Sequence, residues 1–194
     1  MKNYIIGGIL VVLVLLGVSA FGTYNSLVAL DQGTRAKWAD VEGQYQRRMD
    51  LIPNLVATVK GAANFEQQTL TDVVEARAKA TQVTVDPTKL DAASIAKYQA
   101  AQGDITTALG KLLAITENYP QLKATENFKD LQSQIEGTEN RIAVSRRDFG
   151  IAVESYNTRV RQFPGNIVAK MFGFSEKAYF KADAAASVAP TVAF

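Results

Sequence analysis

The pattern of apolar and polar positions divides the chain into an apolar N-terminal stretch and a longer part with helical periodicity. Tyr4–Gly22 is almost wholly apolar, and after Lys2 the next charged side chain is Asp31. These 19 residues span about 28 Å at the helical rise, which is close to the hydrocarbon thickness of a bilayer. The stretch therefore predicts a helix that crosses a membrane once.

A cleaved signal peptide is the alternative, because Val18 and Ala20 form an acceptable cleavage site after an apolar run. We favour an uncleaved anchor over residues 1–24, since the run is longer than the core of a usual signal peptide. Lys2 in a short N-terminal tail favours a cytoplasmic N-terminus under the positive-inside rule. The remainder is then expected outside the cytoplasm, in the periplasm if the cell has two membranes.

Beyond the anchor, apolar residues recur every three or four positions, and no alternating strand pattern competes. The spacing and the caps predict helices over about Thr34–Ala63 and Phe65–Gln82, a third that ends before Pro120, and a last one over Thr125–Phe163. Gly61, Asn64 and Gln67 are typical of a break and a new helix start, although one continuous kinked rod is the alternative. The predicted fold class is all-α: an up-and-down antiparallel bundle over residues 25–163, with three long helices and one shorter one.

Composition narrows the chemistry that the chain can perform. It has no Cys and no His, and its 21 basic and 19 acidic residues give a net charge of +2. Disulfides, thiolate and imidazole metal ligands, cysteine nucleophiles and Ser/His/Asp triads are therefore excluded. The small net charge provides no field that would attract nucleic acid. We expect a protein that is not an enzyme and has no cofactor, no metal and no nucleic-acid partner.

Carboxylates carry the only enzyme chemistry that this composition leaves open. Five of them cluster around the third turn of the bundle and the start of the last predicted helix, namely Glu117, Glu126, Asp130, Glu136 and Glu139. Their spacing defines neither a hydrolase pair nor a helical di-metal site, which would need a histidine. We expect them to pair with the arginines Arg47, Arg48 and Arg141.

A polar stripe surrounds a proline inside the first predicted helix. It consists of Arg47, Asp50, Pro53, Asn54 and Thr58, opposite the apolar face. Proline removes a backbone hydrogen bond, so it has a structural cost. A solvated face is the simplest interpretation. We favour a structural role, within the bundle or between protomers, in which Pro53 bends the helix and Asn54 satisfies the released backbone group.

Residues 164–182 interleave aromatic and lysine side chains. The candidates for contact with a membrane surface are Lys170, Phe172, Phe174, Lys177, Tyr179, Phe180 and Lys181. Each has an apolar part or a charged end that suits the bilayer interface. A flap packed on the end of the bundle is an equally good interpretation. Residues 183–194 have the composition of a loose tail.

Four long blocks of sequence stand out: YNSLVALDQ (24–32), QRRMDLIPNLVATVKG (46–61), ENYPQLKATENFKDLQSQIEGTENRI (117–142) and YNTRVRQFPGNIVAKMFGF (156–174). They resemble the LemA family of bacterial membrane proteins, and the likeness covers nearly the whole chain. It departs at Phe149 and Gly150, where the family pattern suggests a Tyr-Asn pair like Tyr156 and Asn157. The resemblance implies a single-pass anchor, an antiparallel helical bundle and no known enzymatic activity or catalytic residues.

A magnetosome-membrane relative in that family implies a part in shaping or organising membranes. We therefore expect a non-enzymatic scaffold of the bacterial inner membrane that contacts lipid and self-associates as a homo-oligomer. Anchoring concentrates a protein in two dimensions, so that modest contacts are enough to assemble it. An adaptor that presents a partner, such as a membrane peptidase or a signalling protein, is the alternative, and a carboxylate enzyme ranks last.

Overall fold

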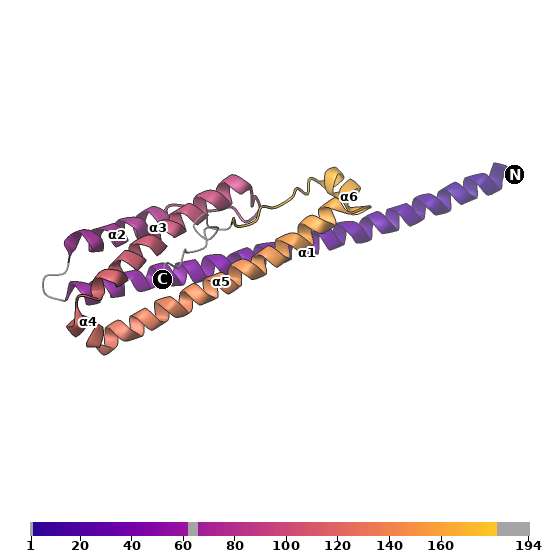
Figure 1. Cartoon of the computed structure of the whole chain (residues 1–194). Coiled ribbons are helices and arrows are strands. Elements are labelled where there is room, and N and C mark those ends of the chain that lie inside the picture. The colour runs from indigo at the N-terminus through magenta and orange to yellow at the C-terminus, as the bar shows by residue number, and fades with distance from the viewer. Residues whose placement is uncertain (1, 62–65, 182–194) are drawn as a thin grey trace, which may run out of the picture.

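The computed structural model describes residues 2–61 and 66–181, and every regular element within these ranges is a helix. The helices are α1 (Lys2–Lys60), α2 (Gln67–Thr81), α3 (Ala92–Thr116), α4 (Pro120–Ala124), α5 (Glu126–Arg161) and α6 (Gly165–Phe172). Figure 1 shows α1 and α5 side by side and α2 against α3. α6 lies beside α1 at the point where the N-terminal part of α1 begins to project beyond the other helices. The predicted all-α fold class is confirmed.

α1 joins the apolar stretch to the rest of the molecule without interruption. Its 59 residues extend over about 89 Å at the helical rise. The sequence predicted an anchor and a separate helix from about Thr34, but the residues between them are helical as well. This linking part contains no proline, and Thr23, Leu27 and Asp31 are buried on one face at helical spacing. No loop therefore separates the apolar stretch from the helical body, which comprises residues 23–61 and 66–181.

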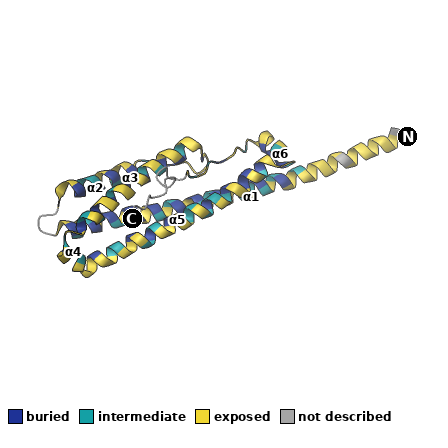
Figure 2. Cartoon of the chain, in the orientation of Figure 1, coloured by how far each residue is buried: buried dark blue, intermediate teal, exposed yellow. Residues whose placement is uncertain are grey.

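The environment of α1 changes sharply along its length. Between Tyr4 and Phe21 the large apolar side chains that the structure describes are 49–86% exposed, whereas from Thr23 onward one face is buried (Figure 2). By length and composition, this N-terminal part of the helix is able to cross a membrane. The N-terminal part is therefore compatible with a single-pass anchor.

Three hydrophobic clusters follow one another along α1, and each draws on a different set of helices. The basal cluster includes Leu27 with Tyr156 of α5 and Val168 of α6. The middle cluster is built around Trp38, whose ring lies 5.4 Å from that of Tyr98 and 5.3 Å from that of Phe149. The distal cluster unites α1, α2, α3, α4 and α5; its largest fully buried members are Ile52, Leu55, Ile105, Leu112 and Phe128. α1 and α5 thus both run through all three clusters.

Contacts between α1 and α5 show that the two helices run in opposite directions. Thr23 meets Arg159, Thr34 meets the carbonyl of Ala152, and Arg48 meets Glu139. α2 also folds back along α1, because Arg77 reaches the carbonyl of Met49. α1 and α2 are therefore separate helices rather than one kinked rod.

Apart from the start of α1, the ends of the predicted helices agree with the sequence signals to within a few residues. α3 ends before Pro120, as predicted, and α5 begins after Thr125. The Thr125 hydroxyl does not cap α5, however, because it donates to the carbonyl oxygen of Leu122 at 2.7 Å. The predicted helix start at Asn64 and the tail over 183–194 lie outside the described residues.

Candidate functional site

The most elaborate set of polar contacts holds residues 173–181, here called the C-terminal strap, onto the helical body. The chain turns into the strap at Gly173, whose φ of 76° is a left-handed conformation that favours glycine. α6 reaches this position by packing tightly on the end of α5. A Cβ atom at Gly165 would overlap the carbonyl oxygen of Arg159, so only glycine allows this approach.

Two adjacent residues of α5 bind the backbone of the strap. Asn157 donates from Nδ2 to the carbonyl of Lys177 at 2.8 Å and accepts from the amide of Lys177 at 2.9 Å. The hydroxyl of Tyr156 donates to the carbonyl of Ser175 at 3.0 Å. Asn157 thereby satisfies both backbone groups of Lys177, much as a neighbouring β-strand would. These three hydrogen bonds hold the backbone of the strap on α5 without a β-sheet.

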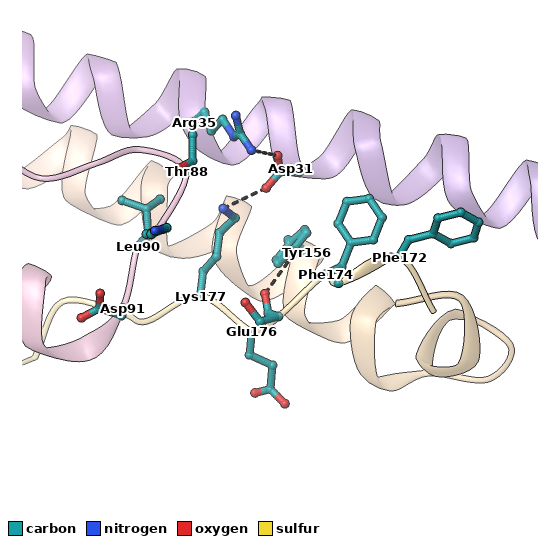
Figure 3. A pocket seen from close by; sticks show the side chains of 13 residues that line it. Asp31, Arg35, Thr88, Leu90, Asp91, Tyr156, Phe172, Phe174, Glu176 and Lys177 are labelled. Carbon is teal, nitrogen blue, oxygen red and sulfur yellow. Dashed lines mark hydrogen bonds and ion pairs between the residues drawn. The ribbon is translucent and has the colours of Figure 1, made fainter. Parts of the chain in front are cut away.

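The side chain of Lys177 adds a buried ion pair with α1 (Figure 3). Its Nζ atom lies 2.8 Å from Oδ1 of Asp31, and the two side chains are only 5% and 10% exposed. Arg35 binds the other carboxylate oxygen of Asp31 at 2.7 Å. The Lys177 ammonium also lies 5.2 Å from the centre of the Tyr156 ring. Buried charges are tolerated only with such partners, so this pairing fixes the strap to α1.

An open cleft of about 430 Å³ lies beside these residues, between α1, the loop before α3 and the strap. Burial raises the pKa of Tyr156 to about 12; the charge of Asp31 acts in the same direction and that of Arg35 opposes it. Tyr156 is therefore a neutral hydrogen-bond donor near pH 7, and both oxygens of Asp31 are engaged. This arrangement suits a structural clamp better than acid–base catalysis.

The end of the strap covers the middle hydrophobic cluster. Phe180 stacks on Trp38 with ring centres 5.7 Å apart, and the guanidinium of Arg146 lies 4.6 Å from the centre of the Phe180 ring. Gln99 of α3 exchanges two hydrogen bonds with the backbone of Lys181, at 2.8 and 3.1 Å. The strap therefore joins α1, α3 and α5 over most of its length.

These contacts divide the residues that the sequence predicted at a membrane surface. Lys177 is 7% exposed, and Phe180 is half-buried against Trp38, so the prediction is corrected for both because their side chains face the body. Phe174 is half-buried beside Tyr24. The remaining candidates have exposed side chains; they are Lys170, Phe172, Tyr179 and Lys181. The strap thus follows the flap interpretation, whereas α6 keeps an exposed surface.

A second buried cation, Arg48, connects three helices and was missed as a site residue by the sequence analysis. Its Nη1 atom donates to Glu139 at 2.6 Å and to Thr106 at 2.8 Å. Its Nη2 atom donates to the backbone and side-chain oxygens of Gln102 at 2.9 and 2.7 Å. The predicted pairing of the five carboxylates with arginines holds for Glu139 and Arg48, whereas Glu117 pairs with Lys123 instead. Arg48 falls three residues after Tyr45 on the apolar face of α1, a signal that was available in the sequence.

Beside Pro53, the released backbone carbonyl has a different partner from the one predicted. Arg47, Asp50, Pro53 and Asn54 are exposed, Thr58 is half-buried, and α1 continues through the proline. Proline lacks the amide that would bond to the carbonyl of Met49. That carbonyl accepts instead from Nε of Arg77 in α2, at 2.9 Å. The prediction that Asn54 satisfies the released group is wrong, because an arginine from the neighbouring helix does so.

The fold and these contacts define a class: an all-helical protein whose N-terminal helix is compatible with a membrane anchor and continues into a strapped helical body. The model of the LemA family matches residues 37–194, and the chain therefore belongs to the LemA family.

Relatives at 25–26% identity include magnetosome proteins and a LemA protein. Magnetosome protein MamQ 2 of Paramagnetospirillum magneticum is 26% identical over 175 residues, which covers 81% of this chain and 64% of that protein. MamQ of Magnetospirillum gryphiswaldense is 25% identical over 174 residues, with the same coverage. Protein LemA of Metamycoplasma hominis is 25% identical over 142 residues, covering 73% of this chain and 61% of that protein. The match spans less than two thirds of the length of each of these relatives.

Proposed function

We propose that the protein is a non-enzymatic scaffold, anchored in the bacterial inner membrane, that self-associates and organises or shapes the membrane or envelope. Its body is placed on the periplasmic or extracytoplasmic side. The observation that carries this proposal is the continuity of α1 from its exposed apolar part into the core of the body. Because no loop intervenes, the body keeps a fixed height and direction relative to the anchor. A rigid mounting suits a structural component.

Two further observations support the scaffold. The relatives named as magnetosome proteins suggest a role in the organisation of a membrane compartment. The outer face of α5 also carries two exposed apolar side chains, Val144 at 47% and Ile151 at 55%, seven residues apart on one stripe. Such residues on copies held in one membrane plane provide modest lateral contacts, which are sufficient at high local concentration.

The test is the particle size of the full-length protein, purified in detergent and in nanodiscs and measured by light scattering and electron microscopy. We expect a large, symmetric particle without any added protein. The double variant Val144→Glu, Ile151→Glu is expected to reduce it toward a monomer. Val74→Glu in α2 is the matched control, because Val74 is an apolar side chain with similar exposure, 49%. A monomer under all conditions would overturn self-association.

The adaptor is the second candidate, because the same exposed pair on α5 suits a different protein as well as a second copy. A membrane-protein partner such as a peptidase or a signalling protein would dock there. In that case the purified protein is monomeric and forms a larger particle only when a second polypeptide is present. Loss of that larger particle in the Val144→Glu, Ile151→Glu variant would locate the docking site on α5.

A further inference from the structure

The base of the helical body carries a group of exposed apolar side chains around one lysine. We call it the basal collar; it consists of Phe163, Ile167, Lys170, Met171 and Phe172. The exposed fractions are 79% for Phe163, 50% for Ile167, 73% for Met171 and 58% for Phe172. Large apolar residues gathered on a surface mark sites of interaction.

The basal collar lies beside α1 at the point where α1 ceases to be exposed on all sides and begins to bury one face. The ring of Phe172 is 4.7 Å from that of Tyr24, and Ala20 packs in the same basal cluster as Val168 and Ala169 of α6. Figure 1 shows α6 next to α1 at this point. Since Tyr4–Gly22 matches the thickness of the hydrocarbon layer, the residues from Ala20 to Tyr24 fall at its edge. The collar is therefore at the height of the lipid headgroups.

α6 has two distinct faces. Gly165, Val168 and Ala169 are buried against α1 and α5, and Phe172 at the end of α6 packs in addition on Tyr24 of α1. Ile167 and Met171 lie one turn apart on the exposed side, and Lys170 is exposed between them. Lys170 forms no ion pair with any residue in 2–61 and 66–181, whereas Arg161 nearby lies 3.8 Å from Glu176. The exposed side thus offers apolar side chains and an available positive charge.

We infer that the basal collar is a second membrane contact, which inserts its apolar side chains among the headgroups of the bilayer that holds α1. Lys170 then binds the phosphate of an anionic phospholipid. A short amphipathic helix with apolar residues and a lysine is suited to the plane of the interface, and anionic lipid attracts each nearby basic residue. This inference rests on the proposed anchoring of α1 in a membrane. It gives the body a second point of support, which restrains rocking about the anchor.

The first test uses depth-dependent quenching, and the absence of native cysteine makes the labelling simple. Met171→Cys in the full-length protein is labelled with an environment-sensitive fluorophore and reconstituted in vesicles of phosphatidylcholine and phosphatidylglycerol. Some of the lipids are brominated near the headgroup. Val74→Cys, at an exposed apolar position on α2, is the control. We expect quenching at position 171 to exceed that at 74 by at least about twofold, because only an interfacial side chain reaches the bromine atoms. Equal quenching overturns the inference.

The second test concerns the lipid charge. Quenching at position 171 is expected to fall when phosphatidylglycerol is omitted or when salt is raised, and Lys170→Gln should remove most of this dependence. One basic residue near an anionic surface contributes a factor of about five in binding. Lys181→Gln, which changes an exposed lysine on the strap, should leave the dependence intact. A dependence that survives Lys170→Gln overturns the headgroup assignment.

Other readouts on the same samples separate this inference from the proposed function. Extraction with alkaline carbonate reports whether α1 is anchored, and particle size reports self-association. Unquenched label on an anchored, assembled protein refutes the collar alone, whereas extractable protein refutes the anchor. Energy transfer between labels at position 171 without quenching by lipid would show that a second copy covers the collar, which also overturns a lipid contact.

Discussion

Arg48 and Lys177 are both buried cations paired with carboxylates, yet they connect different kinds of structure. Arg48 uses its planar guanidinium to bind Glu139, Thr106 and Gln102, and so fixes the register of α1, α3 and α5. Lys177 places one ammonium on Asp31 and fastens a strap to a body that is already formed. The difference follows from the chemistry of the two side chains. The guanidinium of Arg48 is planar and rigid and carries several donors, whereas the ammonium of Lys177 is a compact charge on a flexible aliphatic chain.

The two sites also differ in what remains when the cation is removed. Without Arg48, the side chain of Gln102, which is 2% exposed, loses its partner inside the core, although Glu139 is 37% exposed and remains hydrated. Without Lys177, Asp31 still binds Arg35. Loss of Arg48 should therefore weaken the whole body, whereas loss of Lys177 should mainly release the strap.

Arg48→Met is expected to have the largest effect, lowering the free energy of unfolding by about 3 kcal/mol, because a buried network loses its central donor. The measurement is denaturant unfolding of the full-length protein in detergent, followed by circular dichroism at 222 nm. Arg47→Met is the matched control; it changes an exposed arginine one position away and should alter stability by no more than about 0.5 kcal/mol. Equal effects of the two variants would refute the distinction.

Lys177→Met should act locally. We expect the strap to open more easily by about 2 kcal/mol, which corresponds to roughly thirtyfold faster hydrogen exchange of its amides. Exchange in the distal part of α1 should change much less. Lys181→Met serves as the control, since the Lys181 side chain is exposed and only its backbone is held. Uniform acceleration across the body would contradict a local role for Lys177.

Pro53 and Arg77 allow a third and smaller perturbation. Arg77 is half-buried and forms no ion pair with an acid in residues 2–61 and 66–181. Arg77→Ala removes the donor to the carbonyl of Met49 and should cost about 1 kcal/mol. In the Pro53→Ala background the new amide binds the same carbonyl, so the cost of Arg77→Ala should become smaller. A double-mutant cycle on unfolding free energies measures this coupling. Additive effects would show that the two residues act independently.

Tyr156→Phe should give the smallest effect near neutral pH, about 1 kcal/mol or less, through loss of the bond to Ser175. Its pH dependence is more informative. An unfolded tyrosine ionises near pH 10, whereas burial raises the pKa of Tyr156 to about 12 in the folded protein. The stability that this proton contributes is complete below pH 10 and is lost as the pH rises to about 12. Unfolding measured over this window should show a shallower decline for Tyr156→Phe than for the native protein.

Helical periodicity was sufficient to predict the all-α fold and most of the helix ends, because apolar spacing and proline act locally. The continuity of α1 was missed. Gly22 and Gly33 lower helix propensity by about 1 kcal/mol each, which favours a break on local grounds. Packing of Leu27 and Asp31 against α5, α6 and the strap outweighs that preference, and this packing is visible only in three dimensions.

The candidate site was predictable only where its residues share one helix face. Arg48 lies on the apolar face of α1, and its spacing from Tyr45 and Ile52 indicates burial. Lys177 has no such signal, because the strap has no periodicity and its partners Asp31 and Asn157 are 146 and 20 residues away in sequence. Aromatic and lysine side chains gave α6 and the strap the same appearance in sequence, although α6 keeps one exposed face and the strap turns Lys177 and Phe180 toward the body.

The uninterrupted course of α1 also fixes how the body is rotated about the axis of this helix. Each residue of a helix turns the chain by about 100° and advances it by about 1.5 Å. Inserting a single alanine into the Tyr4–Gly22 part would therefore rotate the whole body by about 100° relative to the side chains that precede the insertion. In the proposed assembly, the side of the body that meets a second copy is therefore set by the rotation of this helix rather than by a flexible joint.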